Sequence, residues 1–163
     1  LLFAAFLKRI QGAEHRSTYL QKDIEKNLNH RFMREDDIYA WIAADEGTRQ
    51  EYARIYSQHL PITVAAYEDI LKMLALVSTK KWYHSVNREI PILLIGGKED
   101  PIGNFGKGIE EVHHRLEDTC HRAELHLYDG MRHNICDEKR RDKVYTDILQ
   151  WMKLHMNEHY EMS

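Results

Sequence analysis

A short aliphatic run, Ile90-Pro91-Ile92-Leu93-Leu94-Ile95, is the feature that most constrains the fold of this chain. Gly96 and Gly97 close it, so its length is that of a strand rather than of a helix. Successive aliphatic residues without polar alternates are typical of a strand that is covered on both faces in a parallel sheet. The sequence therefore predicts an α/β protein with this strand inside the sheet.

A second strand is predicted over residues 123–128, where apolar and polar residues alternate. Alternation with a period of two leaves one face of the strand wetter, which favours a position nearer to the sheet edge. Between the two strands, a helix is predicted from about residue 105 to 116. Its apolar face consists of Ile109, Val112 and Leu116.

Further helices are predicted at both ends of the chain. The last one is expected to begin near Asp137 or Glu138, because acids suit the positive end of a helix dipole. Its apolar stripe is Val144, Ile148, Trp151, Met152 and His155. Residues 1–85 are predicted to be helical, since they contain one proline, Pro61, and repeat apolar residues at helical spacing. The repeat is seen in Ile62, Ala65, Ala66, Ile70, Met73, Leu74 and Val77.

The order strand, loop, helix, strand, loop, helix describes a βαβα unit. A right-handed crossover between two parallel strands places the loops that follow them at the same edge of the sheet. Asp100 lies in the loop after the first strand and His133 in the loop after the second, so the two are predicted to meet. Open α/β sheets bind ligands and carry catalytic groups at that edge.

An acid followed by a histidine matches the chain order nucleophile, acid, histidine that one class of serine hydrolases uses. A serine hydroxyl is a weak nucleophile until an imidazole takes its proton, and a buried carboxylate orients that imidazole and stabilises its charged form. Taken alone, Asp100 would be interpreted as an acid that stabilises a turn, and His133 as a residue of a surface loop. Their order and their places after two strands favour a catalytic pair.

Four segments resemble the serine aminopeptidase, lysophospholipase and monoglyceride-lipase-like group of α/β-hydrolases. Three of them surround the predicted site and lie in the same order as in that group. The fourth, which is followed by Tyr52, resembles the group's tryptophan-containing cap segment. The segments are 90–103 (IPILLIGGKEDPIG), 106–108 (GKG), 127–133 (LYDGMRH) and 39–46 (YAWIAADE).

This resemblance implies the C-terminal part of an α/β-hydrolase fold, with the last two parallel strands and their flanking helices. Residues 1–85 would form a helical cap, or lid, and residues 86–163 the C-terminal part of the core. Asp100 would be the catalytic acid and His133 the catalytic base. The implied activity is hydrolysis of carboxylic esters, with lysophospholipids or monoacylglycerols as leading substrates and without a metal or an organic cofactor.

Two positions depart from the group's pattern. The group commonly has an acid directly after the histidine, where this chain has Asn134, and this leaves the tuning of His133 open. It also has an acid before the cap tryptophan, where this chain has Ala40, a change expected to concern only the cap. The tryptophans predicted to be packing anchors are Trp82, Trp151 and Trp41, of which the last could also contact an acyl chain.

The chain contains no GxSxG elbow, because none of its serines, Ser17, Ser57, Ser78, Ser85 and Ser163, has the flanking glycines. The nucleophile is therefore expected outside this chain, and the opening at Leu1 inside an apolar stretch suggests a fragment. The expected partners are a small-molecule ester or lipid, and either the missing N-terminal half or a second copy at the open sheet edge. A non-catalytic interaction fragment and a peptidase or amidase are the alternative functions.

The 11 histidines raise the question of a metal site. His113 and His114 are adjacent on a predicted helix, so their side chains are expected to diverge by about 100° and not to share an ion. His155 and His159 are one helical turn apart, but histidines there also suit the negative end of a helix dipole. A phosphate loop is only weakly indicated, because the glycines 103, 106 and 108 lack the GxxxxGK[ST] pattern.

Charge and composition exclude several partners. The net charge is −3 with basic residues dispersed among acids, so no nucleic-acid-binding face is expected. The longest apolar run, Leu1–Leu7, is far shorter than the ~20 residues of a membrane span. Two cysteines, Cys120 and Cys136, allow at most one disulfide, which favours free thiols and a cytoplasmic location.

Overall fold

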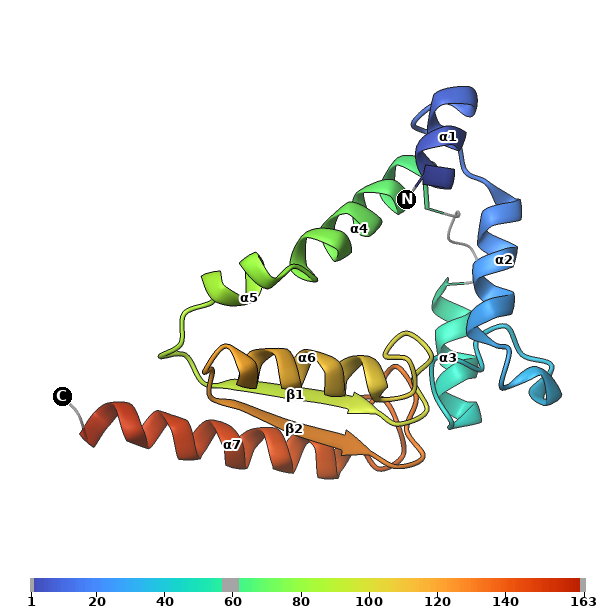
Figure 1. Ribbon diagram of the computed structural model, residues 1–163. Coiled ribbons are helices and arrows are strands. Elements are labelled where there is room, and N and C mark those ends of the chain that lie inside the picture. Colours follow the sequence, from blue (N-terminus) through green and yellow to red (C-terminus); the bar gives the residue numbers. More distant parts are fainter. Residues whose placement is uncertain (1, 57–61, 162–163) are drawn as a thin grey trace. The chain divides into compact units, whose positions relative to one another are not determined.

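The computed structural model describes residues 2–56 and 62–161, and for residues 2–4 and 157–161 the backbone alone (Figure 1). Every described element before residue 86 is helical, as predicted. These are α1 (Leu2–Gln11), α2 (Thr18–Leu28), the 3-10 helix η1 (Met33–Glu35), α3 (Glu46–Tyr56), α4 (Val64–Val77) and α5 (Lys80–Ser85). The remaining elements are β1 (Ile92–Gly97), α6 (Lys107–Asp118), β2 (Ala123–Tyr128) and α7 (Arg141–Glu161). None of the described helices is long and apolar enough to cross a membrane.

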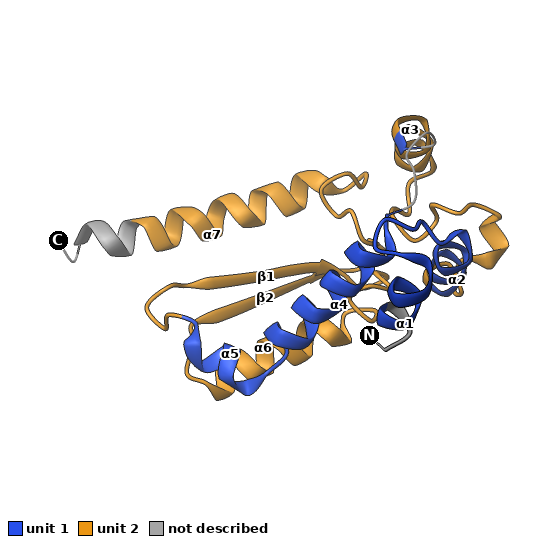
Figure 2. Ribbon diagram, turned by 90° about the horizontal axis from the view of Figure 1, so that it is seen from above, with its two compact units in different colours: residues 1–27, 56–86 blue, residues 28–55, 87–163 orange. Residues whose placement is uncertain are grey.

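The chain divides into two compact units (Figure 2). The first consists of Leu1–Asn27 and Tyr56–Val86, and the second of Leu28–Ile55 and Asn87–Ser163. Residues 28–55 thus pack with the sheet rather than with the other early helices. Whether residues 1–85 cover an active site is a question of function, so the helical cap stays a prediction.

In the first unit, α1 packs against α4. Lys8 forms an ion pair of 2.8 Å with Glu68, whose side chain is largely buried and also binds Lys72 at 2.7 Å. These two amines hold the pKa of the Glu68 carboxyl at about 2. The Thr63 hydroxyl accepts a hydrogen bond from the Ala66 N–H and so caps the N-terminus of α4. The later part of α4 presents apolar side chains to solvent, with Ile70, Leu71, Met73, Leu74 and Leu76 between 37% and 65% exposed.

In the second unit, β1 and β2 form a parallel pair, with Ile92 opposite Ala123 and Gly97 opposite Tyr128. Figures 1 and 2 show α6 and α7 on opposite faces of this pair. Both strands confirm the predicted βαβα order. The apolar face of α6 lies so close to β1 that a Cβ on Gly96 would overlap with the Ile109 side chain.

A small core joins β2, the loop after it and α7. It consists of Tyr128, Met131, Ile135 and Val144, with Ile95, Cys136 and Ile148 packed against it. Burial raises the pKa of the Tyr128 hydroxyl to about 12, and the nearby Asp147 carboxylate adds to this effect. The core fixes the loop that carries the predicted catalytic histidine.

Two of the predicted helices begin a few residues later than expected. Helix α6 begins at Lys107 because the three residues before it adopt positive φ angles of 49° at Asn104, 57° at Phe105 and 85° at Gly106, which a right-handed helix does not allow. Helix α7 begins at Arg141 because the Glu138 carboxylate turns inward to bind backbone N–H groups instead of facing its own helix.

The predicted stripe on α7 is also only partly buried. Val144 is fully buried and His155 nearly so, whereas Met152 is 46% exposed. In the described part of the chain, β1 pairs with β2 alone, and the side chains of 92–95 are half-buried. Within the residues that the structure describes, the cover on both faces and the inner position that the aliphatic run predicts are therefore incomplete.

Candidate active site

The site begins where the loop after β2 crosses the end of β1. The Lys98 N–H donates to the Tyr128 carbonyl at 3.0 Å, and the Glu99 N–H to the Met131 carbonyl at 2.9 Å. At Gly97 the two segments approach so closely that a Cβ would overlap with the carbonyl oxygens of Met131 and Arg132. Glycine at this position therefore allows the two loops to lie side by side.

Asp100 is held in its loop by its own backbone and side chain. Its Oδ1 accepts a hydrogen bond of 2.8 Å from the Ile102 N–H, and its carbonyl accepts one of 2.7 Å from the Phe105 N–H. Only 6% of the residue is exposed. Because this turn uses Oδ1, the second carboxylate oxygen, Oδ2, is left for a partner on the next loop.

The structure brings Asp100 and His133 together, as predicted. The Asp100 Oδ2 lies 3.1 Å from the His133 Nδ1, which is hydrogen-bonding distance. The acid is buried, whereas 36% of the histidine side chain is exposed. Because Nδ1 faces the carboxylate, Nε2 is the ring nitrogen left for a reacting group. This is the geometry in which an acid orients a catalytic base.

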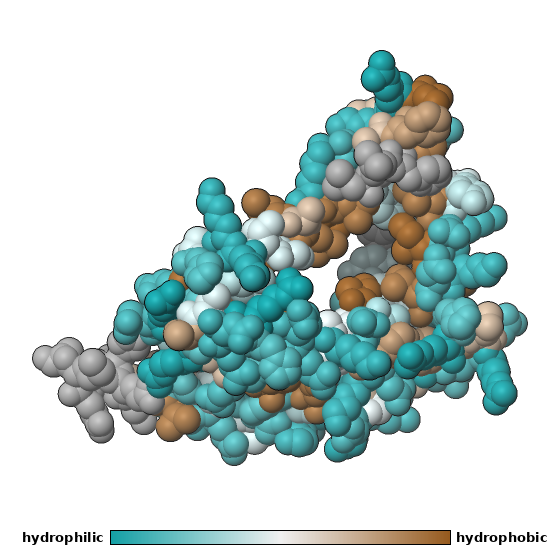
Figure 3. Space-filling view, viewed as in Figure 1, coloured by the Kyte–Doolittle hydropathy of each residue, from teal (hydrophilic) through white to brown (hydrophobic). Residues whose placement is uncertain are grey.

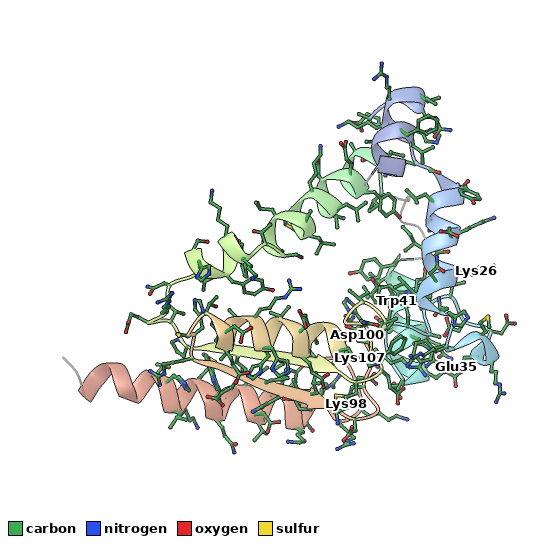
Figure 4. All side chains as sticks on the ribbon, in the orientation of Figure 1. Lys26, Glu35, Trp41, Lys98, Asp100 and Lys107 are labelled. Atoms are coloured by element: carbon green, nitrogen blue, oxygen red, sulfur yellow. The ribbon has the colours of Figure 1, made fainter. Side chains whose placement is uncertain are left out.

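Trp41 lies against the same histidine. The ring centroids of Trp41 and His133 are 5.2 Å apart, at an interplanar angle of 40°. The Trp41 N–H donates to the Asn29 side-chain oxygen at 2.9 Å, which anchors the backbone below the ring. Figure 4 labels Trp41 and Asp100, which lie beyond the carboxyl ends of the strands. An indole beside the imidazole gives the site an apolar wall.

Arg132, directly before the histidine, is buried and binds the segment around Trp41. Its guanidinium donates two hydrogen bonds to the Glu35 carboxylate, a third at 2.5 Å to the Ala40 carbonyl, and stacks on the Phe32 ring at 3.9 Å. The bonds from Arg132 hold the pKa of the Glu35 carboxyl below its usual value. The Ala40 atom in this contact is its backbone carbonyl, which any residue would offer, so the expectation that the departure at Ala40 concerns only the cap stays a prediction.

Glu138 joins the same two segments through backbone hydrogen bonds. Its carboxylate accepts from the Ala44 N–H at 2.7 Å, the Asp45 N–H at 3.2 Å and the Arg132 N–H at 3.0 Å. The residue is only 4% exposed, so the carboxylate is shielded from competing water. The Asn134 N–H adds a bond of 2.8 Å to the Ile42 carbonyl. Residues 40–45 and 131–138 are thus tied together on both sides of His133.

Sequence reasoning missed Glu35, Arg132 and Glu138 as site residues. In the sequence, Arg132 is one residue of the segment 127–133 that resembles the hydrolase group, and nothing there indicates its contacts. Glu138 is predicted only as the start of the last helix. An acid that turns inward to bind a distant backbone leaves no periodic pattern. The one available signal was the adjacency of Arg132 to His133.

The described serines are used in helix caps rather than at this site. The Ser17 Oγ accepts from the Leu20 N–H at 3.2 Å, the Ser78 hydroxyl donates to the Leu74 carbonyl at 2.7 Å, and the Ser85 hydroxyl donates to the Trp82 carbonyl at 2.7 Å. Ser57 and Ser163 lie outside the described residues. The N–H groups of Lys107 and Gly108 donate to carbonyls of their own loop, which removes them as ligands for a phosphate group.

The expectation that the side chains of His113 and His114 diverge was wrong. Both Nδ1 atoms lie 3.4 Å from the Glu117 Oε2. Free rotation about the side-chain bonds of the more exposed ring offsets the 100° between neighbouring positions on the helix. His155 instead stacks on Trp151 at 4.5 Å, and the side chain of His159 lies outside the described residues.

No protein-family model and no curated protein matches this sequence. Solved structures do match it. One is the crystal structure of a highly thermostable carboxyl esterase from Bacillus coagulans in complex with glycerol, with a TM-score of 0.84 at 22% identity over 93% of this chain and 50% of that chain. Another is a lipase in an open form, with a TM-score of 0.82 at 24% identity and the same coverage.

This likeness shows the fold. The chain carries part of the α/β-hydrolase fold and spans about half the length of the two structures. The predicted fold class, with two parallel strands between flanking helices, is confirmed.

Proposed function

We propose that this chain supplies the acid and the histidine of a serine ester hydrolase. The observation that carries the proposal is the 3.1 Å contact between the Asp100 Oδ2 and the His133 Nδ1, at the carboxyl edge of a parallel strand pair. The fold is one on which carboxyl esterase and lipase structures are known. Both residues lie on loops that hydrogen bonds and a packed core hold in place, as catalysis requires.

The proposed reaction depends on the His133 Nε2, the ring nitrogen that does not face Asp100. The His133 Nε2 would take the proton from a serine hydroxyl as its oxygen attacks the ester carbonyl, and would then give that proton to the leaving alcohol. A water molecule would next give a proton to His133 as it attacks the acyl carbonyl carbon, and the bond to the serine oxygen would break as that oxygen takes the proton back. Asp100 would orient the imidazole and stabilise its charged form. These steps use no metal or organic cofactor. The serine and the oxyanion donors would come from an N-terminal part of the whole enzyme.

Lipid-like esters are the proposed substrates, with lysophospholipids or monoacylglycerols first. The Trp41 ring beside His133 offers an apolar wall to an acyl chain. The exposed apolar side chains of α4 give the proposed cap a surface suited to lipid, and Figure 3 shows apolar surface in the region of α4. Long acyl chains favour binding surfaces of this kind.

Activity-based labelling of the whole enzyme tests the proposal. A fluorophosphonate probe should modify one serine in a GxSxG segment upstream of Leu1, and the same probe should leave the 163-residue chain unlabelled. Hydrolysis of monoacylglycerol and lysophospholipid but not of a peptide amide would separate an esterase from a peptidase. Labelling of a serine within residues 1–163, or a whole protein that reacts with no probe, would contradict the proposal. The second result would favour an interaction protein.

A further inference from the structure

A second cluster of chemically active side chains lies on α6, outside the site described above. It consists of His113, His114 and Glu117, and one ligand atom from each lies within 4.8 Å of the other two. The side chain of His113 is 17% exposed, that of Glu117 53% and that of His114 72%. The cluster is therefore open to solvent on one side and anchored in the protein on the other.

Two of the three distances in this cluster match those of a coordination shell, and the distance between the two histidine ligand atoms is at most 4.8 Å. Nitrogen and oxygen ligands bind zinc at about 2.0–2.2 Å in a tetrahedron, so two ligands of one ion lie about 3.4 Å apart. Both histidine Nδ1 atoms lie 3.4 Å from the Glu117 Oε2. A small rotation of the exposed His114 ring completes the shell, because nothing packs tightly against a side chain that is 72% exposed.

The hydrogen bond on the far side of His113 fixes which nitrogen can bind an ion. Its Nε2 lies 3.1 Å from the Ala123 carbonyl oxygen, which can only accept, so Nε2 carries a proton. In the neutral ring the Nδ1 lone pair then faces the Glu117 carboxylate, which is also an acceptor. A backbone carbonyl that orients a histidine in this way is the usual outer partner of a metal ligand.

We propose that His113, His114 and Glu117 bind a divalent transition-metal ion, with zinc as the best match. Two imidazoles and one carboxylate suit zinc, cobalt and nickel better than calcium or magnesium, which prefer oxygen ligands alone. Three protein ligands leave one position of a tetrahedron for water. The ion would join the C-terminal turn of α6 to the first residue of β2 through Ala123.

Calorimetric titration of the 163-residue chain with zinc chloride tests this site independently of any hydrolase activity. The wild-type chain should bind one ion, and cobalt should give the visible spectrum of a tetrahedral complex. His114→Gln and Glu117→Gln should each weaken binding by at least about tenfold, since each removes a ligand. Both positions are exposed, so far-UV circular dichroism should show an unchanged fold.

Two control variants keep the test specific. Glu111→Gln removes an exposed carboxylate from the same helix, and His84→Gln removes an exposed histidine from α5. Both should bind zinc as the wild type does. Absence of binding by the wild-type chain would show that the contacts are ordinary histidine–carboxylate pairs. Unchanged affinity in both His114→Gln and Glu117→Gln would place the binding on other histidines, and either result would overturn the proposal.

Discussion

The Glu138 carboxylate accepts a hydrogen bond of 3.0 Å from the backbone N–H of Arg132, the residue that precedes the proposed catalytic base. The same carboxylate binds the N–H groups of Ala44 and Asp45. A carboxylate has two oxygens that only accept, so one buried side chain can hold three donors from two distant segments. The position of His133 therefore depends on residues far from it in sequence.

Glu138→Gln should destabilise the protein by about 1–3 kcal/mol, because the amide group turns one acceptor into a donor that faces a backbone N–H. Turnover of the whole enzyme should fall as well, since the histidine loop would shift. Urea unfolding and steady-state kinetics measure the two effects. Asp137→Asn, at an exposed neighbouring position, is the matched control and should have little effect on either. Equal stability of the Glu138→Gln variant and the wild type would contradict this account of the loop.

His133→Ala should lower the turnover of the whole enzyme by about 10³-fold or more, because the serine would lose its base. Asp100→Asn should have a comparable effect by favouring the wrong tautomer of the imidazole. His84→Ala, which changes an exposed residue of α5, should leave turnover unchanged. Steady-state kinetics with a short-chain ester checks all three. Activity within tenfold of the wild type in either site variant would remove that residue from the proposed triad.

Gly97→Ala should destabilise the protein by about 1–3 kcal/mol or more and displace the histidine loop, because the new Cβ would overlap with two backbone carbonyl oxygens. Gly96→Ala is an adjacent control, since its Cβ would meet the end of the Ile109 side chain, which can rotate away. Thermal unfolding and crystal structures of both variants give the comparison. A smaller loss of stability in Gly97→Ala than in Gly96→Ala would show that the loop crossing is not tight.

Sequence alone predicted the elements that follow local rules. The aliphatic run up to Ile95 and the alternation over 123–128 specify strands by composition and period, and both strands form in parallel. Topology then brought Asp100 and His133 to one edge, and the structure places them in contact. Periodicity and connection handedness are sufficient for this much, because neither depends on distant residues.

The remainder depends on long-range contacts that leave no local pattern. Residues 28–55 pack with the sheet through the hydrogen bonds that Arg132 and Glu138 form with them. A helical wheel reports only the faces of one helix and so does not predict these hydrogen bonds. The left-handed turn at Asn104 and Phe105 is missed for a related reason, since non-glycine residues adopt positive φ angles only when the surrounding contacts impose them. Side-chain rotation allowed His113 and His114 to converge against the helical-wheel argument.

The ion pair between Glu35 and Arg132 should make stability depend on pH in the acidic range. In the folded protein the pKa of the Glu35 carboxyl lies below the ordinary value of 4.5. The ion pair therefore contributes fully to the stability above pH 4.5, and this contribution is lost as the pH falls through the folded-state pKa. The stability difference between the wild type and Glu35→Gln should be constant from about pH 6 to 8 and should narrow below about pH 4. Urea unfolding of both proteins at several pH values measures this. If the difference in unfolding free energy between the two proteins were the same at pH 3 and pH 7, the ion pair would contribute nothing to stability.

One edge of β1 is open in the described residues. In the part of the chain that the structure describes, β1 pairs with β2 on one side only. Its side chains over 92–95 are half-buried, and Ile90 just before it is 56% exposed. An aliphatic strand with unpaired N–H and C=O groups along one edge is a template for pairing with another strand, and two strands alone make a marginal sheet.

We therefore expect the 163-residue chain to associate with itself, or with a polypeptide that supplies the N-terminal half of the fold, through β1. Size-exclusion chromatography with light scattering should give a mass above the 19.4 kDa of one chain. Leu93→Lys should reduce the association, because a charged side chain on an open edge opposes pairing. Glu110→Lys, which adds a positive charge at an exposed position of α6 away from this edge, is the control and should not reduce it. A monomer of 19.4 kDa that unfolds cooperatively would show that β1 needs no further strand beside it.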